Sequence, residues 1–217
     1  MMVSALFKAS EIEIKYQKEA IKTLDALLDI MYKKELFHSY NKNETLKTKG
    51  LLEDYAYLIK ALIDGYTHTF NDKYLDYAKK LSQEVKKFKK DNKWFMSLDN
   101  ILADFSDSAY ASSLSILANS FLDLSLLTFD LELKNEADEI IKNGSYYINN
   151  YPFYYPTITK AYLKSNKAYI IKTKKPLFEL ETIYPYLLFK KGEEFEICDY
   201  TKCIKKSSNL KEIIKEI

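Results

Sequence analysis

Arginine is absent from this 217-residue chain, so all 33 of its basic residues are lysines. The planar guanidinium of arginine is the group best suited to two-point binding of phosphate or carboxylate. Its absence argues against a phosphoryl-transfer or nucleotide site. The lysines are balanced by 31 acidic residues. The chain therefore also lacks the basic excess that is typical of nucleic-acid-binding proteins, and we predict no nucleic-acid partner.

Glycine and proline are scarce, with four residues of each. The first proline is Pro152, and the other three follow it in the last third of the chain. Because these two residue types are the strongest interruptions of regular structure, the sequence before Pro152 predicts long helices.

Cysteine is equally rare, with only Cys198 and Cys203 present. The first ten residues lack the basic segment and cleavage site of an export signal, so we expect a reducing cytoplasmic location and free thiols. The most apolar stretch, 114–129, contains Asn119 and Asp123 and is too short for a membrane span. The C-x4-C spacing has no second ligand pair nearby for zinc. No metal or cofactor is therefore predicted, although a redox or metal role of the two cysteines stays open.

Two kinds of helical pattern alternate along the chain. Segments near 16–31, 74–88 and 133–148 carry one apolar stripe opposite a charged face, which predicts half-exposed helices. Segments 51–66 and 107–128 are apolar or small on most faces, which predicts helices that are buried all round. The opening 1–9 resembles the buried kind, and 153–163 is a further candidate.

This repeat of about 55 residues predicts two layers of helices. The fold class is therefore mainly α, as an incomplete α/α toroid of helical hairpins over residues 1–165. Residues 166–217 are predicted to form a small α/β tail, with strands at 168–171, 186–189 and 195–198 and a closing helix near 209–215. Trp94-Phe95-Met96 predicts another short strand.

Several stretches resemble the C-terminal part of the bacterial YyaL-like proteins and the related spermatogenesis-associated thioredoxin-domain proteins. They are VSALFKAS at 3–10, GLLEDYAYLIKALIDGY at 50–66, DKYLDYAKKL at 72–81 and FEICDYTKCIKKSSNLKEII at 195–214. The resemblance implies a thioredoxin-like domain followed by a six-hairpin toroid similar to sugar epimerases and glycosidases. It also implies that this chain corresponds to the later part of that toroid, with the remainder upstream. The apolar pattern that begins at Met1 without a cap residue agrees with this expectation.

Acidic residues are the first candidates for catalysis. Glu53 and Asp54 open a predicted buried helix, where they could act as general acid and base at the mouth of a toroid or stabilise the helix dipole. Asp107 follows a loop, where aspartate is also a preferred helix cap. The resemblance aligns Asp107 and Ser112 with an Asp and a following Pro-Ser-Gly-Asn-like element of the family, near the start of a buried helix. The family's Gly-Asn pair is replaced there by Ser113 and Leu114.

The remaining candidates are ligand-binding residues. Tyr55 and Trp94 offer rings on which a sugar could stack, although core packing explains such aromatics equally well. His38 lies in a predicted loop from which it could reach a cavity. Together with Ser112, these residues complete the candidate set. His68 lies near a helix end without the neighbouring motif of a histidine-based epimerase.

Two hypotheses about function follow. In the first, the chain is a carbohydrate-related binding or enzymatic module that acts on a small molecule. In the second, it is a degenerate structural module that associates with itself or with an upstream half-protein, without activity of its own. The sequence does not decide whether the protein is an enzyme.

Overall fold

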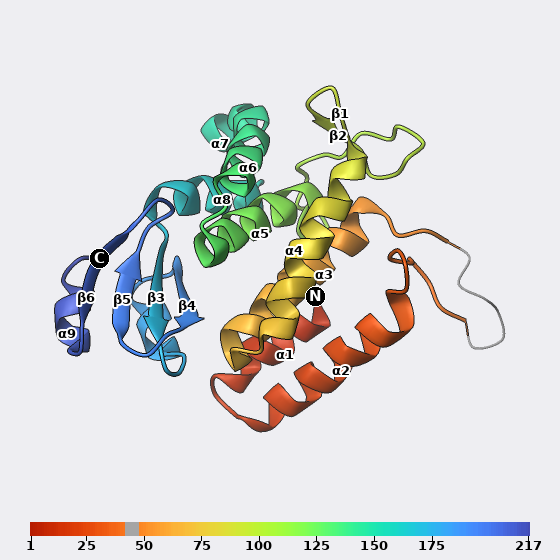
Figure 1. Ribbon diagram of the computed structural model, residues 1–217. Helices are drawn as coiled ribbons and strands as arrows, with labels where there is room; N and C mark the ends of the chain where they lie inside the picture. The colour runs from red at the N-terminus through yellow and green to blue at the C-terminus, as the bar shows by residue number, and fades with distance from the viewer. Residues whose placement is uncertain (42–47) are drawn as a thin grey trace. The chain divides into compact units, whose positions relative to one another are not determined.

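The computed structural model describes residues 1–41 and 48–217 and is mainly helical with a small sheet (Figure 1). The chain divides into two compact units. The first contains 1–66 and 71–117, and the second contains 67–70 and 118–217. The predicted boundary between 165 and 166 falls inside the second unit and stays a prediction.

The first unit is built from α1 (Met2–Ser10), α2 (Lys15–Met31), most of α3 (Leu52–Thr69) and α4 (Asp72–Glu84). The 3-10 helix η1 (Val85–Phe88) continues α4 into a short antiparallel pair, β1 (Lys89–Lys90) and β2 (Lys93–Trp94). The strand predicted at 94–96 is thus present in part, because β2 ends at Trp94. Phe95 forms only an isolated bridge with Leu102.

Burial confirms the predicted alternation of helices from α2 to α5 (Ser113–Thr128). No residue of α3 or of α5 is exposed. In contrast, α2 and α4 each bury one stripe, such as Ala20, Leu24 and Leu28 in α2. Gly65 permits close packing in α3, since a Cβ there would lie 2.8 Å from Leu24 Cδ2 and 3.1 Å from Tyr74 Cδ2.

Three helical predictions need correction. The opening helix α1 is not buried all round, because only Val3, Phe7 and Ser10 are buried. The second buried helix begins at Ser113 and not at 107. The segment 153–163 is not a buried helix either, since a helix begins there only at Pro156 and buries a single stripe.

The second unit contains the rest of α5, followed by α6 (Leu131–Asn143), α7 (Ser145–Asn150) and α8 (Pro156–Lys167). Asp130 caps α6 by accepting the backbone N–H of Glu132 at 2.9 Å. Pro156 occupies the first turn of α8, where its missing N–H costs nothing. The helix predicted over 133–148 is therefore two helices that meet at Gly144.

A four-stranded sheet completes this unit, in the order β4-β3-β5-β6. The strands are β3 (Tyr169–Thr173), β4 (Leu187–Lys191), β5 (Phe195–Cys198) and β6 (Cys203–Ser207). The pair β3–β4 is parallel and joined through the 3-10 helix η2 (Phe178–Thr182), whereas the other pairs are antiparallel. The three predicted strands are confirmed, and β6 was missed.

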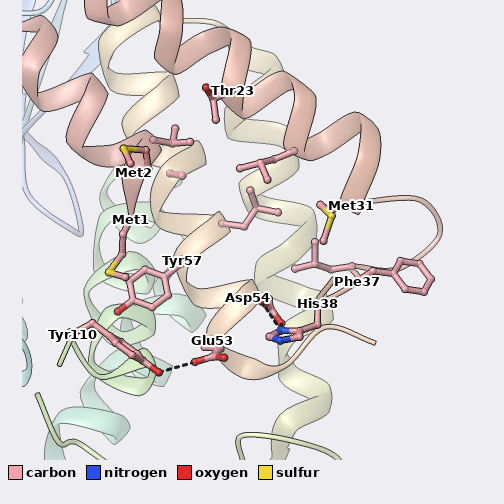
Figure 2. Close-up of a pocket in the computed structure, with 15 residues that line it drawn as sticks. Met1, Met2, Thr23, Met31, Phe37, His38, Glu53, Asp54, Tyr57 and Tyr110 are labelled. Carbon is pink, nitrogen blue, oxygen red and sulfur yellow. Dashed lines mark hydrogen bonds and ion pairs between the residues drawn. The ribbon is translucent and has the colours of Figure 1, made fainter. Parts of the chain in front are cut away.

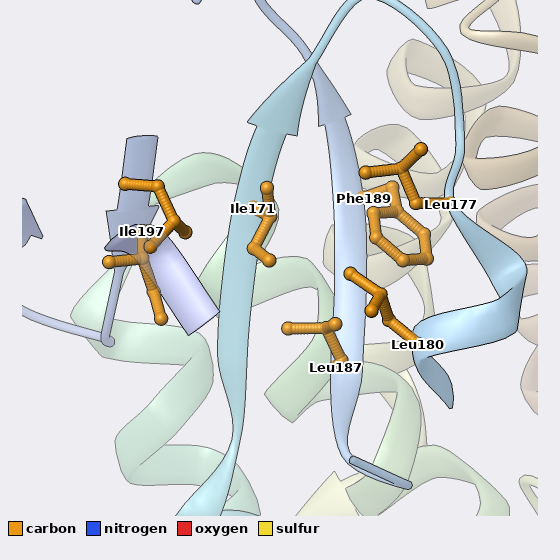
Figure 3. Close-up of a cluster of buried hydrophobic side chains, with 7 residues drawn as sticks. Ile171, Leu177, Leu180, Leu187, Phe189 and Ile197 are labelled. Atoms are coloured by element: carbon orange, nitrogen blue, oxygen red, sulfur yellow. The ribbon is translucent and has the colours of Figure 1, made fainter. Parts of the chain in front are cut away.

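The core of this sheet is a cluster of aliphatic and aromatic side chains (Figure 3). Ile171, Phe189 and Ile197 come from three adjacent strands and are fully buried. The last helix, α9 (Leu210–Ile214), adds Ile213 to the cluster. Asn209 caps this helix by accepting the N–H of Lys211, which confirms the predicted closing helix.

Candidate functional site

A cavity of about 560 Å³ lies in the first unit, between α1, α2, the segment after α2 and the start of α3 (Figure 2). Apolar side chains such as Met2, Leu27 and Met31 form much of its wall. Apart from Thr23 on α2, its polar side chains gather near the start of α3, and they belong to His38, Glu53, Asp54, Tyr57 and Tyr110. This combination of an apolar wall and a few convergent polar groups is typical of small-molecule sites.

Asp54 is fixed by the beginning of helix α3. Its Oδ2 atom accepts the backbone N–H of Leu51 at 2.7 Å, as an acid in the first helical turn does in a capping box. The same Oδ2 lies 2.9 Å from Nδ1 of His38, and Oδ1 lies 3.2 Å from it. One carboxylate therefore caps the helix and orients the histidine.

His38 is held by a backbone hydrogen bond as well as by Asp54. The backbone N–H of His38 donates to the carbonyl of Thr48 at 2.9 Å, and the neighbouring Phe37 forms a β-bridge with Lys49. The hydrogen bond and the charge of Asp54, aided by the charge of Glu53, raise the pKa of His38 above its usual value. In neutral His38, a proton on Nδ1 bonded to Asp54 leaves Nε2 as the acceptor.

Tyr57 and Tyr110 are site residues that the sequence analysis missed. Tyr110 donates its hydroxyl to Glu53 Oε2 at 3.3 Å, and its ring packs edge-on to Tyr57 with 6.4 Å between centroids. Tyr57 donates to the carbonyl of Ala111. Burial, followed by Tyr110, Asp107 and Glu53, raises the pKa of Tyr57 to about 12, so this hydroxyl stays a donor at neutral pH.

Helical spacing in the sequence could have identified one of these tyrosines as a neighbour of Glu53. Tyr57 follows Glu53 by four residues and therefore lies on the same face of α3. Tyr110 lies in an irregular segment before α5, where no periodicity predicts which way a side chain points.

Asp107 and Ser112 do not line the cavity. Asp107 Oδ1 accepts the N–H of Ser112 at 2.8 Å, and Ser112 Oγ accepts the N–H of Ser115 at 3.2 Å as the cap of α5. Ser112 also donates to the carbonyl of Asp104 at 2.7 Å. Asp107 nevertheless lies within electrostatic range of the cavity, because it contributes to the raised pKa of Tyr57.

Tyr55 and Trp94 are also outside the cavity lining, and both are buried. Tyr55 receives hydrogen bonds from Lys87 Nζ at 2.8 Å and from the N–H of Leu36 at 3.4 Å. Its ring packs edge-on against Phe88. The burial of both aromatic candidates places them in the packed interior.

The two histidines do not share this cavity. His38 lines it, whereas the ring of His68 stacks on Phe178 in the second unit, with 4.4 Å between ring centroids.

The prediction of free thiols was wrong, because Cys198 and Cys203 form a disulfide bond. Strand β6 explains the error. It begins at Cys203 and returns antiparallel beside β5, which places the two cysteines opposite each other. Spacing alone does not reveal that pairing.

No protein-family model matches the chain, and no curated protein matches it. The resemblance to YyaL-like proteins therefore remains an expectation from the sequence. Among residues 1–41 and 48–217, no helix combines the length and apolar character that a membrane crossing requires.

Proposed function

We propose that the cavity in the first unit binds a carbohydrate or a similarly hydroxylated small molecule. The observation that carries this proposal is the pairing of His38 with Asp54 at the polar end of an otherwise apolar cavity, beside Glu53. Carboxylates accept hydrogen bonds from ligand hydroxyls, and tyrosine combines an apolar ring face with a hydroxyl donor. A polyol ring with hydroxyls on its edge and C–H groups on its faces suits such a lining.

The pair also supports proton transfer within this proposed role. An imidazole whose Nδ1 is bonded to a carboxylate has its Nε2 oriented and its protonated form stabilised, as a general base requires. His38 would take a proton from a ligand hydroxyl or from the carbon beside a carbonyl, and Asp54 would stabilise the resulting imidazolium. Tyr57 already donates its hydroxyl proton to the carbonyl of Ala111, so towards a ligand it would contribute its ring face and the acceptor capacity of its neutral hydroxyl oxygen.

Binding can be measured directly by calorimetry or by ligand-observed NMR with a panel of mono- and disaccharides. Asp54→Asn retains an oxygen for the Leu51 N–H but removes the charge, and Glu53→Gln removes the other carboxylate with little change in shape. We expect each change to weaken binding of the best sugar about tenfold or more, since each removes a charged hydrogen-bond partner.

Asp76→Asn is the matched control, because Asp76 is an exposed acid of α4 whose partner is Lys79, and it does not line the cavity. It should leave binding unchanged. The proposal fails if no sugar binds the wild-type protein, or if all three variants bind with the same affinity.

We extend the proposal to the fold and the cellular location. The alternation of one-sided helices with the buried helices α3 and α5 supports helical hairpins that belong to an α/α toroid of the YyaL-like kind. The same family resemblance supports a carbohydrate-related role. A cytoplasmic location remains a separate proposal from the sequence, and the disulfide bond does not support it.

A second proposal is an interaction module without activity, which binds another copy of the chain or an upstream half-protein. The exposed apolar residues of the first unit favour it, for example Met2 at 72% and Ile12 at 94% exposure. Light scattering coupled to size exclusion would detect self-association. A monomer at all concentrations would argue against self-association, and a pull-down with the upstream gene product would test the other partner.

A further inference from the structure

A second polar cluster lies on the sheet of the second unit, apart from the residues of the proposed sugar site. It consists of Lys172 on β3, Glu196 and Cys198 on β5, and Cys203 on β6. Lys172 and Glu196 are direct cross-strand partners, and the lysine Nζ lies 2.5 Å from Glu196 Oε2. The same Nζ lies 3.5 Å from the sulfur of Cys203.

A break in the strand register brings the two sulfurs together. Ile197 pairs with Lys205, but the next residue, Cys198, pairs with Cys203 and leaves Ile204 without a direct partner. Such a bulge redirects side chains, and bulges are over-represented next to active sites. Without this register shift, Ile204 would lie opposite Cys198.

The turn between the cysteines is held independently of the disulfide. Asp199 Oδ1 accepts the N–H groups of Thr201 at 2.7 Å and of Lys202 at 2.8 Å, as well as the Thr201 hydroxyl. The N–H of Asp199 donates to the carbonyl of Lys202 at 2.9 Å. Burial by itself would raise the pKa of Asp199, but these hydrogen bonds lower it below its usual value. None of them involves a sulfur atom.

The two cysteines differ in access. Cys198 is fully buried, whereas Cys203 lies on the edge strand β6 and is at least partly exposed. A thiol–disulfide exchange centre needs this asymmetry, with one sulfur that a partner thiol can reach and one that is protected.

We propose that Cys198–Cys203 is a redox-active disulfide that exchanges with a dithiol, with Cys203 as the reacting sulfur and Lys172 as the cation that stabilises its thiolate. A purely structural disulfide does not require a buried–exposed pair with an ammonium group beside the exposed sulfur. A cation next to a cysteine favours the thiolate, which is both the better nucleophile and the better leaving group.

The exchange balances in two steps. A thiolate of the dithiol attacks Cys203 Sγ, the sulfur–sulfur bond breaks, and the Cys198 sulfur leaves with the electron pair and takes a proton from water. The second thiolate of the dithiol then attacks the dithiol sulfur that is bonded to Cys203. The mixed disulfide breaks, and Cys203 leaves as a thiolate beside Lys172. The dithiol is oxidised by two electrons, and the cysteine pair is reduced by two.

Glu196 sets how strongly Lys172 stabilises the Cys203 thiolate. In the oxidised chain its carboxylate pairs with Lys172, so the ammonium is held at the site before a thiolate exists. In the reduced chain the Cys203 thiolate and Glu196 share the same ammonium. The Nζ atom of Lys172 also lies 5.7 Å from the ring centroid of Phe129.

The first test measures the thiolate in the Cys198→Ser variant, which leaves Cys203 as the sole thiol. The rate of alkylation by iodoacetamide is followed between pH 5 and 10. Adding Lys172→Met should slow alkylation at pH 7 about three- to tenfold and move the profile to higher pH. Lys172→Arg keeps the charge and should restore most of the rate.

Lys174→Met is the matched control. Lys174 follows Lys172 by two residues, is paired with Glu193 at 3.8 Å, and its side chain is 73% exposed. It should leave the alkylation profile unchanged. Identical profiles for Lys172→Met, Lys172→Arg and Lys174→Met would overturn the role of Lys172.

The second test uses the wild-type chain under native conditions. Dithiothreitol or glutathione buffers of graded ratio are added, free thiols are trapped, and mass spectrometry gives the oxidised fraction while circular dichroism monitors folding. We expect reversible reduction of the folded chain, and a glutathione mixed disulfide on Cys203 in the Cys198→Ser variant. Reduction only after unfolding, or no mixed disulfide, would show a structural disulfide and overturn the proposal. Neither test depends on sugar binding.

Discussion

The ammonium of Lys164 lies 2.7 Å from Oδ1 of Asp123, and both side chains are almost completely buried, at 8% and 3% exposure. The two residues are 41 positions apart and join α8 to α5 within the second unit. Tyr200 donates its hydroxyl to the carbonyl of Lys164 at 3.3 Å, and the burial of that hydroxyl, followed by the charge of Asp123, raises its pKa. A charge buried at this depth is tolerable only while its partner is present.

Breaking this ion pair from one side should therefore be costly. We expect Lys164→Met to lower the free energy of unfolding by about 3–5 kcal/mol, because it leaves the carboxylate of Asp123 buried without a counter-charge. The double variant Lys164→Met/Asp123→Leu should recover most of the loss. Urea denaturation of the three proteins measures both effects. Equal losses for the single and double variants would contradict this account.

Removing the cap of α3 should destabilise the first unit by a smaller amount. Asp54→Ala leaves the N–H of Leu51 without its acceptor, and we expect a loss of about 1 kcal/mol. Asp54→Asn keeps an acceptor and should lose less than half as much. Thermal unfolding of both variants against wild type tests this order, and a greater loss for asparagine would refute it.

The titration of His38 should report its contact with Asp54. Because the folded-state pKa is raised, the stabilisation is fully present below the unfolded value of about 6.5 and is lost as the pH rises through the folded value. NMR titration of the imidazole should show the raised pKa in wild type and a lower one in Asp54→Asn. The same pKa in both proteins would mean that Asp54 is not the cause.

Gly65 should not tolerate a side chain, although it lies inside a helix. Alanine normally stabilises a helix by up to about 1 kcal/mol relative to glycine. Here its Cβ would lie 2.8 Å from Leu24 Cδ2 and close to the ring of Tyr74, so we expect a net destabilisation of about 1–3 kcal/mol. Chemical denaturation of Gly65→Ala measures it. An increase in stability would show that α2 and α4 adjust without cost.

The mainly helical class and the burial of α3 and α5 could be predicted, because helical periodicity is a local property of the sequence. The extent to which α1 is buried could not be predicted in the same way. The apolar pattern of α1 is that of a helix buried all round, but other segments, distant in sequence, decide which of its side chains are covered. Glu53 and Asp54 were predicted as site residues from their position at a helix start, and both line the cavity.

The sequence by itself determined most of the helices and three strands of the sheet, since side-chain spacing and cap residues act within a few positions along the chain. Only the tertiary structure decided which side chains meet. It placed His38 against Asp54, Tyr110 against Glu53, and Cys203 beside Lys172. These contacts join residues between 16 and 57 positions apart. Partners so far apart are selected by packing and strand register, which local patterns do not encode.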